Sequence, residues 1–340
     1  GAQFLSAIKE KHPDSIRIAL SGETDANMIY RCVQHAHQYL AKPCDMNVLT
    51  GTVQRAMSLR ELVQEEELKK VISNMTTLPS LPEAYTAIME ELQSEDPSLE
   101  RIGKIIETDV AMSAKLLQIV NSAFFGLVRH VCSPGEAEMY FGVDVIRSLV
   151  LTTGGFSQSD DSKVDPAALT AIWNHSMRVG SLAKTIMMKE SGDKLLADYA
   201  MMGGLLSNVG KLVVAANFPE RFADIQAQID AGEKPEIEIE KEVMSHCHTE
   251  IGAYLLCIWG LPNPVIECVA YHHAPAACVE TGFAPVSAVH IATAIVDAGG
   301  KEELPGLDAD YVEAVGVTDK IPKWVQVAND IGGDGESDGG

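Results

Sequence analysis

The chain has 340 residues, of which 26 are Lys or Arg and 48 are Asp or Glu, so its formal net charge is −22. Its hydrophobic fraction of 46% is typical of a folded globular protein and excludes disorder over most of the length. A strong negative field repels phosphate backbones, so nucleic acid is not an expected partner. Residues 1–60 are slightly basic, unlike the remainder, and this difference predicts a domain boundary.

No apolar run approaches the ~20 residues that a membrane-spanning helix needs, and the first residues lack the organisation of a signal peptide. The seven cysteines form no Cys-x-x-Cys pair, and their odd number favours neither a disulfide framework nor a zinc ribbon. We therefore expect a cytoplasmic protein with reduced, buried thiols and no membrane partner.

The first sixty residues alternate between the patterns of helix and strand. Helices are predicted at 3–11, 23–34 and 45–58, and strands at 15–20 and 38–41. This order is typical of a parallel sheet covered by helices. The run at 59–74, rich in Glu, Leu and Lys, predicts one connecting helix, within a linker over 59–75.

From about residue 78 onward nearly every segment has the 3.6-residue period of a helix. Helices are predicted at 83–92, from 96 onward, and at 112–121, 135–141, 143–152, 166–189, 195–215, 219–231, 239–259, 264–273, 286–298 and 309–315. Asp109 is expected to cap the helix at 112–121. The Gly- and acid-rich tail at 330–340 is predicted to be disordered.

The first segment resembles the second half of a response-regulator receiver domain, because the runs IRIALSGETD and QYLAKP match the ends of two of its strands. The resemblance implies three switch positions, which are Ser21, Tyr39 and Lys42. The phosphorylated Asp and the acidic Mg²⁺ site of that family would precede Gly1. We therefore expect residues 1–58 to be the C-terminal half of a receiver, a partial α/β (flavodoxin-like) fragment that is not itself phosphorylated.

A half sheet leaves one edge of the strand at 15–20 bare, and bare apolar edges recruit partners. We expect this edge, or the helix at 23–34, to contact a second chain or to pack against the helical part. A homodimer through the receiver fragment is one form that such a contact takes.

Several polar residues fall on the apolar stripes of the predicted helices or directly follow them. They are His175, Asn208, His248, His272 and His273. Polar groups that gather in an interior need partners and often mark a site. The pattern therefore predicts an inward-facing polar cluster, with an ordinary hydrogen-bonded core histidine as the alternative at each position.

The runs WNHSMRVGSLA, GGLLSNVGKLVV and YHH resemble the HD phosphohydrolase scaffold, in which a His-Asp pair of the second run bridges the metal. Here Ser207 and Asn208 occupy the positions of that pair. Serine is a poor metal ligand and asparagine carries no negative charge, so most of the metal affinity should be lost.

Further runs identify a narrower resemblance, to the HDOD family, whose name means HD-related output domain. These are LPSLPEA, ETDVAMSAKLLQIVNSAFFG and HTEIGAYLLCIWGLPNPVIECVAYHH. The resemblance covers residues 76–329 and implies a mainly α, multi-helical HD-like domain without catalytic residue, metal or cofactor. The former active site would become a candidate pocket, formed by His175, Ser207, Asn208, His248, His272 and His273.

HDOD domains act as output modules behind receivers in bacterial signalling, and no common enzymatic activity is established for them. The resemblance therefore implies a non-catalytic binding module of a two-component response regulator. The implied partners are a cognate histidine kinase, acting in a phosphorelay on the full-length protein, and a downstream protein or small-molecule ligand. One alternative is a residual metal-dependent phosphohydrolase that uses an all-imidazole site on a nucleotide or cyclic dinucleotide. Another is a scaffold whose cleft is filled by its own side chains.

Overall fold

In the computed structural model of this chain, the described residues are 2–12, 15–21, 36–62, 65–75, 78, 82–94, 97–121, 131, 136, 166–232, 234–279 and 282–333. The predicted helices at 23–34, 135–141 and 143–152 lie outside them, apart from Glu136. The chain divides into two units, each built from two stretches. The first unit comprises residues 1–173 and 208–262, and the second comprises residues 174–207 and 263–340.

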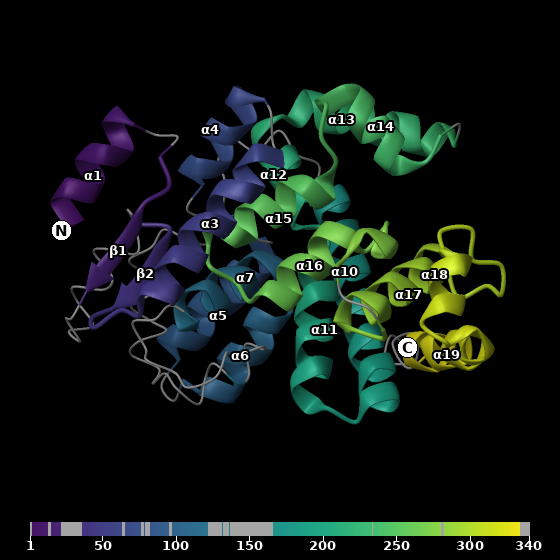
Figure 1. The fold of residues 1–340 in the computed structure, drawn as a ribbon. Coiled ribbons are helices and arrows are strands. Elements are labelled where there is room, and N and C mark those ends of the chain that lie inside the picture. Colours follow the sequence, from purple (N-terminus) through teal and green to yellow (C-terminus); the bar gives the residue numbers. More distant parts are fainter. Residues whose placement is uncertain are drawn as a thin grey trace. The chain divides into compact units, whose positions relative to one another are not determined.

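The N-terminal part of the first unit contains two short parallel strands (Figure 1). Its elements are α1 (Ala2–Lys11), β1 (Ile18–Ser21), β2 (Gln38–Ala41) and α3 (Met46–Leu62). The strand predicted at 38–41 is confirmed. The first strand begins three residues later than predicted, because the backbone N–H of Arg17 donates to Nδ1 of His37 (3.0 Å) instead of to a strand.

The predicted connecting helix at 59–74 is two helices. The first, α3, ends at Leu62, and α4 spans Glu66–Asn74, with Glu65 between them in an extended conformation (φ −75°, ψ 117°). Leu68 and Ile72 of α4 are fully buried, and α4 packs against α15 (His248–Ile258). Burial of this short apolar face stabilises α4 as a separate helix that begins at Glu66.

In the described remainder of the first unit the elements are helices, organised around α15. Its other helices are α5 (Pro82–Gln93), α6 (Leu99–Glu107), α7 (Val110–Val120), α12 (Val209–Asn217), α13 (Pro219–Ala231) and α14 (Glu236–Met244). α15 packs against α3, α4 and α12, and every residue of α15 except Glu250 is buried (Figure 1). A helix that is apolar on all sides belongs in a core, and α15 fills that place.

Two helix starts in the first unit test the cap predictions. Oδ1 of Asp109 accepts the backbone N–H of Met112 (2.8 Å), so the predicted cap of α7 is confirmed. α6 begins at Leu99, later than predicted from the Asp-Pro pair at 96–97, because Ser98 is its N-cap. The Ser98 hydroxyl accepts the backbone N–H of Arg101.

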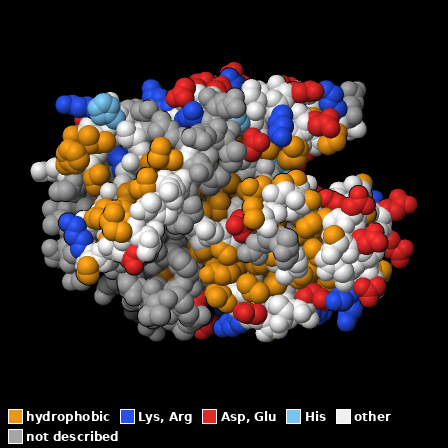
Figure 2. All heavy atoms as spheres, in the orientation of Figure 1, with side chains coloured by type: hydrophobic (Ala, Val, Ile, Leu, Met, Phe, Trp, Pro, Cys, Tyr) orange, Lys and Arg blue, Asp and Glu red, His pale blue; other side chains and the backbone are white. Residues whose placement is uncertain are grey.

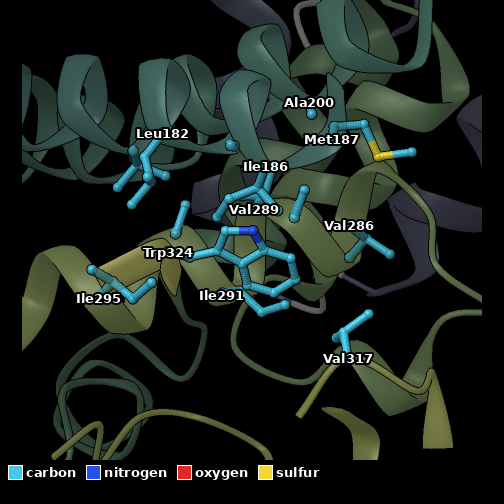
Figure 3. Packing of buried hydrophobic residues seen from close by; sticks show 14 of the residues in the cluster. Leu182, Ile186, Met187, Ala200, Val286, Val289, Ile291, Ile295, Val317 and Trp324 are labelled. Atoms are coloured by element: carbon cyan, nitrogen blue, oxygen red, sulfur yellow. The ribbon is translucent and has the colours of Figure 1, made fainter. Parts of the chain in front are cut away.

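The second unit packs its helices around Trp324, which is only 1% exposed. Its helices are α10 (Pro166–Ser191), which begins in the first unit, α11 (Lys194–Leu206), α16 (Asn263–Tyr271), α17 (Pro285–Asp297), α18 (Ala309–Ala314) and α19 (Ile321–Gly333), with 3₁₀ turns η2 (Pro275–Ala277) and η3 (Thr318–Lys320). Figure 3 shows the Trp324 indole among Ile186, Val289 and Ile291. Aromatic side chains of this size contribute strongly to core stability, so α19 is an integral part of the unit.

Glycines allow α10 and α11 to cross with their backbones in contact. A Cβ on Gly204 would lie 2.8 Å from Cα of Gly180, and a Cβ on Gly180 would lie 2.9 Å from the carbonyl oxygen of Met201. Both separations are too short for a side chain, so these positions require glycine for packing.

Two helices predicted as continuous are each broken at or next to a residue of the predicted pocket. The helix predicted at 195–215 is α11 and α12, separated by Ser207 and Asn208. The helix predicted at 239–259 is α14 and α15, separated by three residues that start with Ser245 in a left-handed conformation (φ 61°) and end just before His248. The apolar period keeps its phase across each break, so periodicity alone predicts one helix where there are two.

α19 extends into the segment that was predicted to be a disordered tail. α19 extends to Gly333, so the prediction of disorder from residue 330 is wrong for residues 330–333, which continue the helix that buries Trp324. Residues 334–340 lie outside the described part. Figure 2 shows acidic side chains gathered around α18. Glu302 and Glu303, in the segment before α18, and Asp310 of α18 are exposed.

One described stretch, Lys194–Asn217, is long and apolar enough to cross a membrane by composition. The structure breaks this stretch at Ser207–Asn208, and 78% of its most apolar window is buried inside the structure. Buried core segments pass the same test, so the stretch is no clear membrane span.

Candidate functional site

The six residues of the predicted pocket are divided between the two units. Asn208 and His248 belong to the first unit, whereas His175, Ser207, His272 and His273 belong to the second. The common pocket therefore stays a prediction, and the residues of each unit are described separately.

His248 is the first residue of α15 and is 1% exposed. Its Nδ1 lies 2.7 Å from Oε2 of Glu240 on α14, and its backbone N–H donates to the same oxygen (2.9 Å). Because a carboxylate only accepts hydrogen bonds, Nδ1 carries the proton in this pair. Glu240 is itself 4% exposed, so the pair is buried and its orientation is fixed.

A second carboxylate lies beside this pair. Donor atoms of Glu236, Glu240 and His248 lie within 4.8 Å of one another. Oε1 of Glu236 also accepts from Nζ of Lys211 on α12 (2.7 Å). A small cavity at this corner, with room for about one water molecule, is lined by Lys211, Val214, Phe222, Ile225, Gln226, Glu240, Met244, His246 and His248.

Glycine sets the separation between α12 and α15. A Cβ on Gly210 would lie 2.0 Å from the carbonyl oxygen of His248, so only glycine allows this approach. The close approach holds His248 beside the first turn of α12, which follows Asn208. Asn208 is 3% exposed and makes no side-chain cap bond, so the prediction that it points inward is confirmed.

In the second unit, His175 pairs with an acidic residue that sequence reasoning missed. Its Nε2 lies 2.7 Å from Oδ1 of Asp297, the last residue of α17. The side chains are 27% and 48% exposed, so the prediction that His175 is buried is wrong. The pair lies at the surface because Asp297 ends its helix, where a charged side chain reaches water.

The Ser207 hydroxyl is committed to the helix that precedes it. Oγ donates to the carbonyl oxygen of Gly204 (2.8 Å), and the residue is fully buried. Back-bonding of this kind satisfies a carbonyl at the end of α11 and turns the hydroxyl proton toward the helix backbone. Ser207 therefore acts as a structural residue at the end of α11.

His272 and His273 differ in burial. His272 is 1% exposed, and its Nδ1 donates to the backbone carbonyl of Val269 (3.0 Å). His273 is partly exposed, which corrects the prediction that both point inward, because both residues lie beyond the end of α16. The two rings lie 4.3 Å apart and are tilted by 44°.

A fourth histidine of this unit, His290, was not singled out in the sequence. Nδ1 of His290 donates to the carbonyl oxygen of His272 (2.8 Å), and Nε2 accepts the backbone N–H of Asp308 (2.9 Å). These two bonds require a neutral ring. Burial lowers the pKa of His290, in agreement with that role. Its position within the apolar run of α17 was the one available signal.

The switch positions implied by the receiver resemblance are placed as follows. Ser21 ends β1, Tyr39 lies in β2, and Lys42 is exposed just after β2. The side chains of Ser21 and Tyr39 lie outside the described part of the structure. A buried neutral imidazole lies nearby: Nε2 of His37 donates to the carbonyl oxygen of Ser73 (2.7 Å), and burial lowers the pKa of His37 to about 3.

The HDOD domain family model matches residues 78–275, more than half of the chain. The chain belongs to the HDOD family. This confirms the resemblance stated from the sequence and the mainly α, multi-helical fold. The match begins at residue 78, so the receiver half stays a prediction for residues 1–58.

Two solved structures of the MmoQ response regulator from Methylococcus capsulatus str. Bath are similar to this chain. One has a TM-score of 0.55 at 22% identity and covers 73% of this chain and 98% of its own. The other, a fragment, has a TM-score of 0.53 at 23% identity and covers 72% of this chain and 94% of its own. At these identities the likeness shows the HDOD fold of this family member and no more.

A curated relative, an uncharacterized protein of Treponema pallidum (strain Nichols), is 27% identical to the HDOD chain over 252 residues. The match covers 72% of this chain and 45% of the relative. The chain thus spans less than half the length of that protein.

Proposed function

We propose that this HDOD chain is the output part of a bacterial two-component response regulator and binds its target without catalysis. Membership of the HDOD family supports the signalling role. The similar structure of MmoQ is that of a response regulator, which supports the same role.

The proposal that the chain has no catalytic activity rests on the pair Ser207–Asn208. A catalytic metal of the HD type needs an imidazole and a carboxylate at these positions. The Ser207 hydroxyl instead donates a hydrogen bond to the Gly204 carbonyl oxygen (2.8 Å), and the side-chain amide of Asn208 is uncharged. The residues at this position therefore do not fit the metal of the related hydrolases, and no hydrolytic step follows from them.

The buried imidazoles fit recognition better than hydrolysis. His248 is oriented by Glu240, and His272 by the carbonyl of Val269, so each ring is held in one direction before any ligand arrives. Preorganised polar groups lower the entropic cost of binding. They would recognise a small polar ligand or a polar segment of a downstream protein.

In this proposal, residues 1–58 are the receiver half through which the full-length protein responds to a cognate histidine kinase. Ser21, Tyr39 and Lys42 would be its switch positions, and the edge of β1 would serve a homodimer. α3 and α4 are then the relay between receiver and output domain. The break at Glu65 makes this relay a joint between two helices, not a rigid rod.

The test combines binding and turnover on one set of compounds. The chain is incubated with nucleotides and cyclic dinucleotides, with Mn²⁺ or Mg²⁺ present, and product is followed by chromatography while ligand-observed NMR reports binding. We expect no product beyond that formed by the Asn208→Ala and His248→Ala variants, and saturable binding if the ligand is of this class. Turnover by the wild-type chain that both variants lose would establish the residual phosphohydrolase instead.

A further inference from the structure

Three donor side chains that include neither Ser207 nor Asn208 gather at the corner between α14 and α15. Glu236 and Glu240 are four residues apart on α14 and so share one face of that helix. His248 follows a turn of three residues and starts α15. All three belong to the first unit, and their donor atoms lie within 4.8 Å of one another.

We propose that Glu236, Glu240 and His248 form a binding site for one divalent transition-metal ion. Imidazole together with carboxylates suits Zn²⁺, Mn²⁺, Co²⁺ and Fe²⁺. The site is independent of the Ser207–Asn208 position, and its role is to fasten α14 to α15. It assigns no turnover to the chain.

The distances between donor atoms are close to those that a metal imposes. Nδ1 of His248 lies 2.9 and 2.7 Å from the two oxygens of Glu240. Ligand atoms around Zn²⁺ lie ~3.3 Å apart, given metal–ligand distances of ~2.0–2.2 Å and tetrahedral angles. An increase of about half an ångström in the distance between Nδ1 and the carboxylate oxygens would therefore make room for the ion. The ion takes the place of the proton between Nδ1 and the carboxylate, and the ring changes to the tautomer that is protonated on Nε2.

The charges at this corner favour a cation. The carboxylate of Glu236 is bound to the ammonium of Lys211 (2.7 Å), whereas the carboxylate of Glu240 faces the His248 ring (2.7 Å). Both carboxylates attract an incoming cation. Glu240 and His248 are buried, so the attraction is screened less than at the surface.

The site also has an entry path. The Glu236 side chain is 26% exposed and Lys211 is 16% exposed, whereas Glu240 and His248 lie behind them. An ion reaches Glu236 first and then competes with the Lys211 ammonium for that carboxylate. This competition gives the proposal its sharpest test, because removal of Lys211 should strengthen metal binding.

The experiment uses the full chain, freed of metal with a chelator that is then removed by dialysis. Zn²⁺ binding is measured by calorimetry, and Co²⁺ binding by its visible absorption, which reports the ligand set. Three variants are compared: Glu236→Gln at the rim, Lys211→Met, and the control Glu242→Gln. Glu242 lies on the same helix, is exposed and pairs with Lys234, so its variant makes the same charge change outside the site. Circular dichroism confirms that each variant folds.

We expect about one equivalent of Zn²⁺, a loss of affinity of ~10–100-fold in Glu236→Gln, and no change in Glu242→Gln. Lys211→Met should bind about tenfold more tightly. Affinity that is equal in Glu236→Gln and wild type, or weaker in Lys211→Met, would overturn the metal site. Metal binding with turnover would leave the site standing and overturn the non-catalytic function, so the two proposals fail separately.

Discussion

The buried histidines of the two units have different kinds of partner. His248 in the first unit meets the carboxylate of Glu240, whereas His290 in the second unit lies between a carbonyl oxygen and a backbone N–H. A ring that donates to a carbonyl and accepts from an amide is held neutral, because protonation would break the second bond. A ring beside a carboxylate can share a proton with it or exchange that proton for a metal.

This difference separates structure from candidate chemistry more sharply than burial does. His248 and His290 are each 1% exposed. The ring of His290 fastens α17 to the start of α18 through Asp308 and has both nitrogens in use. The partners of a buried histidine, and not its position on an apolar face, therefore indicate whether it has chemistry to perform.

The largest expected effect on stability is at the carboxylate of Glu240. Glu240→Ala leaves the buried His248 ring and its backbone N–H without their acceptor, so we expect a loss of about 3 kcal/mol in the free energy of unfolding. Urea denaturation measures it. Glu238→Ala, on the same helix and exposed, is the control and should cost less than about 0.5 kcal/mol. Equal costs would show that the Glu240–His248 pair does not support the fold.

A smaller loss in the free energy of unfolding is expected at His290, whose ring is hydrogen-bonded to backbone groups. His290→Leu keeps apolar volume but leaves the Asp308 N–H and the His272 carbonyl without their partners, at a cost of about 2 kcal/mol. Hydrogen exchange should show the loss first at the amides of α18. Unchanged protection there would contradict the fastening role of His290.

The same ring makes stability depend on pH. Burial lowers the pKa of His290, so the unfolded chain binds a proton that the folded chain does not. The stabilisation is full above the unfolded pKa of about 6.5 and is lost as pH falls below it, by at most ~1.4 kcal/mol per pH unit. His37 acts in the same direction, with a pKa of about 3. The contribution of His290 is therefore measured as the difference between wild type and His290→Leu, which should shrink as pH falls from 7 to 5.

Local features of the fold were predictable from the sequence. The helix at 219–231, the strand at 38–41 and the Asp109 cap follow from period, turn residues and cap chemistry, which act within a few residues. The sequence runs quoted for the HDOD resemblance also predicted the family, because runs of the expected residue types follow in the expected order over most of the chain. These predictions needed no knowledge of long-range contacts.

The partners of the candidate residues were not predictable. Asp297 is 122 residues from His175, and period only states on which side of a helix each lies. Glu240 is eight residues from His248, but the break between α14 and α15 folds the chain back so that they meet. Both helix breaks keep the apolar phase, so their presence depends on packing that the sequence pattern does not contain.

The smallest expected effect concerns the surface pair of His175 and Asp297. Both side chains are partly exposed, and exposed ion pairs contribute ~0–1 kcal/mol, so Asp297→Asn should lower the free energy of unfolding by less than about 0.5 kcal/mol. A matched variant, Asp310→Asn, removes an exposed charge elsewhere in the second unit and should behave alike. A loss above about 2 kcal/mol confined to Asp297→Asn would make this pair structural, like His290. A small loss identifies His175–Asp297 as a surface ion pair that orients the imidazole without supporting the fold.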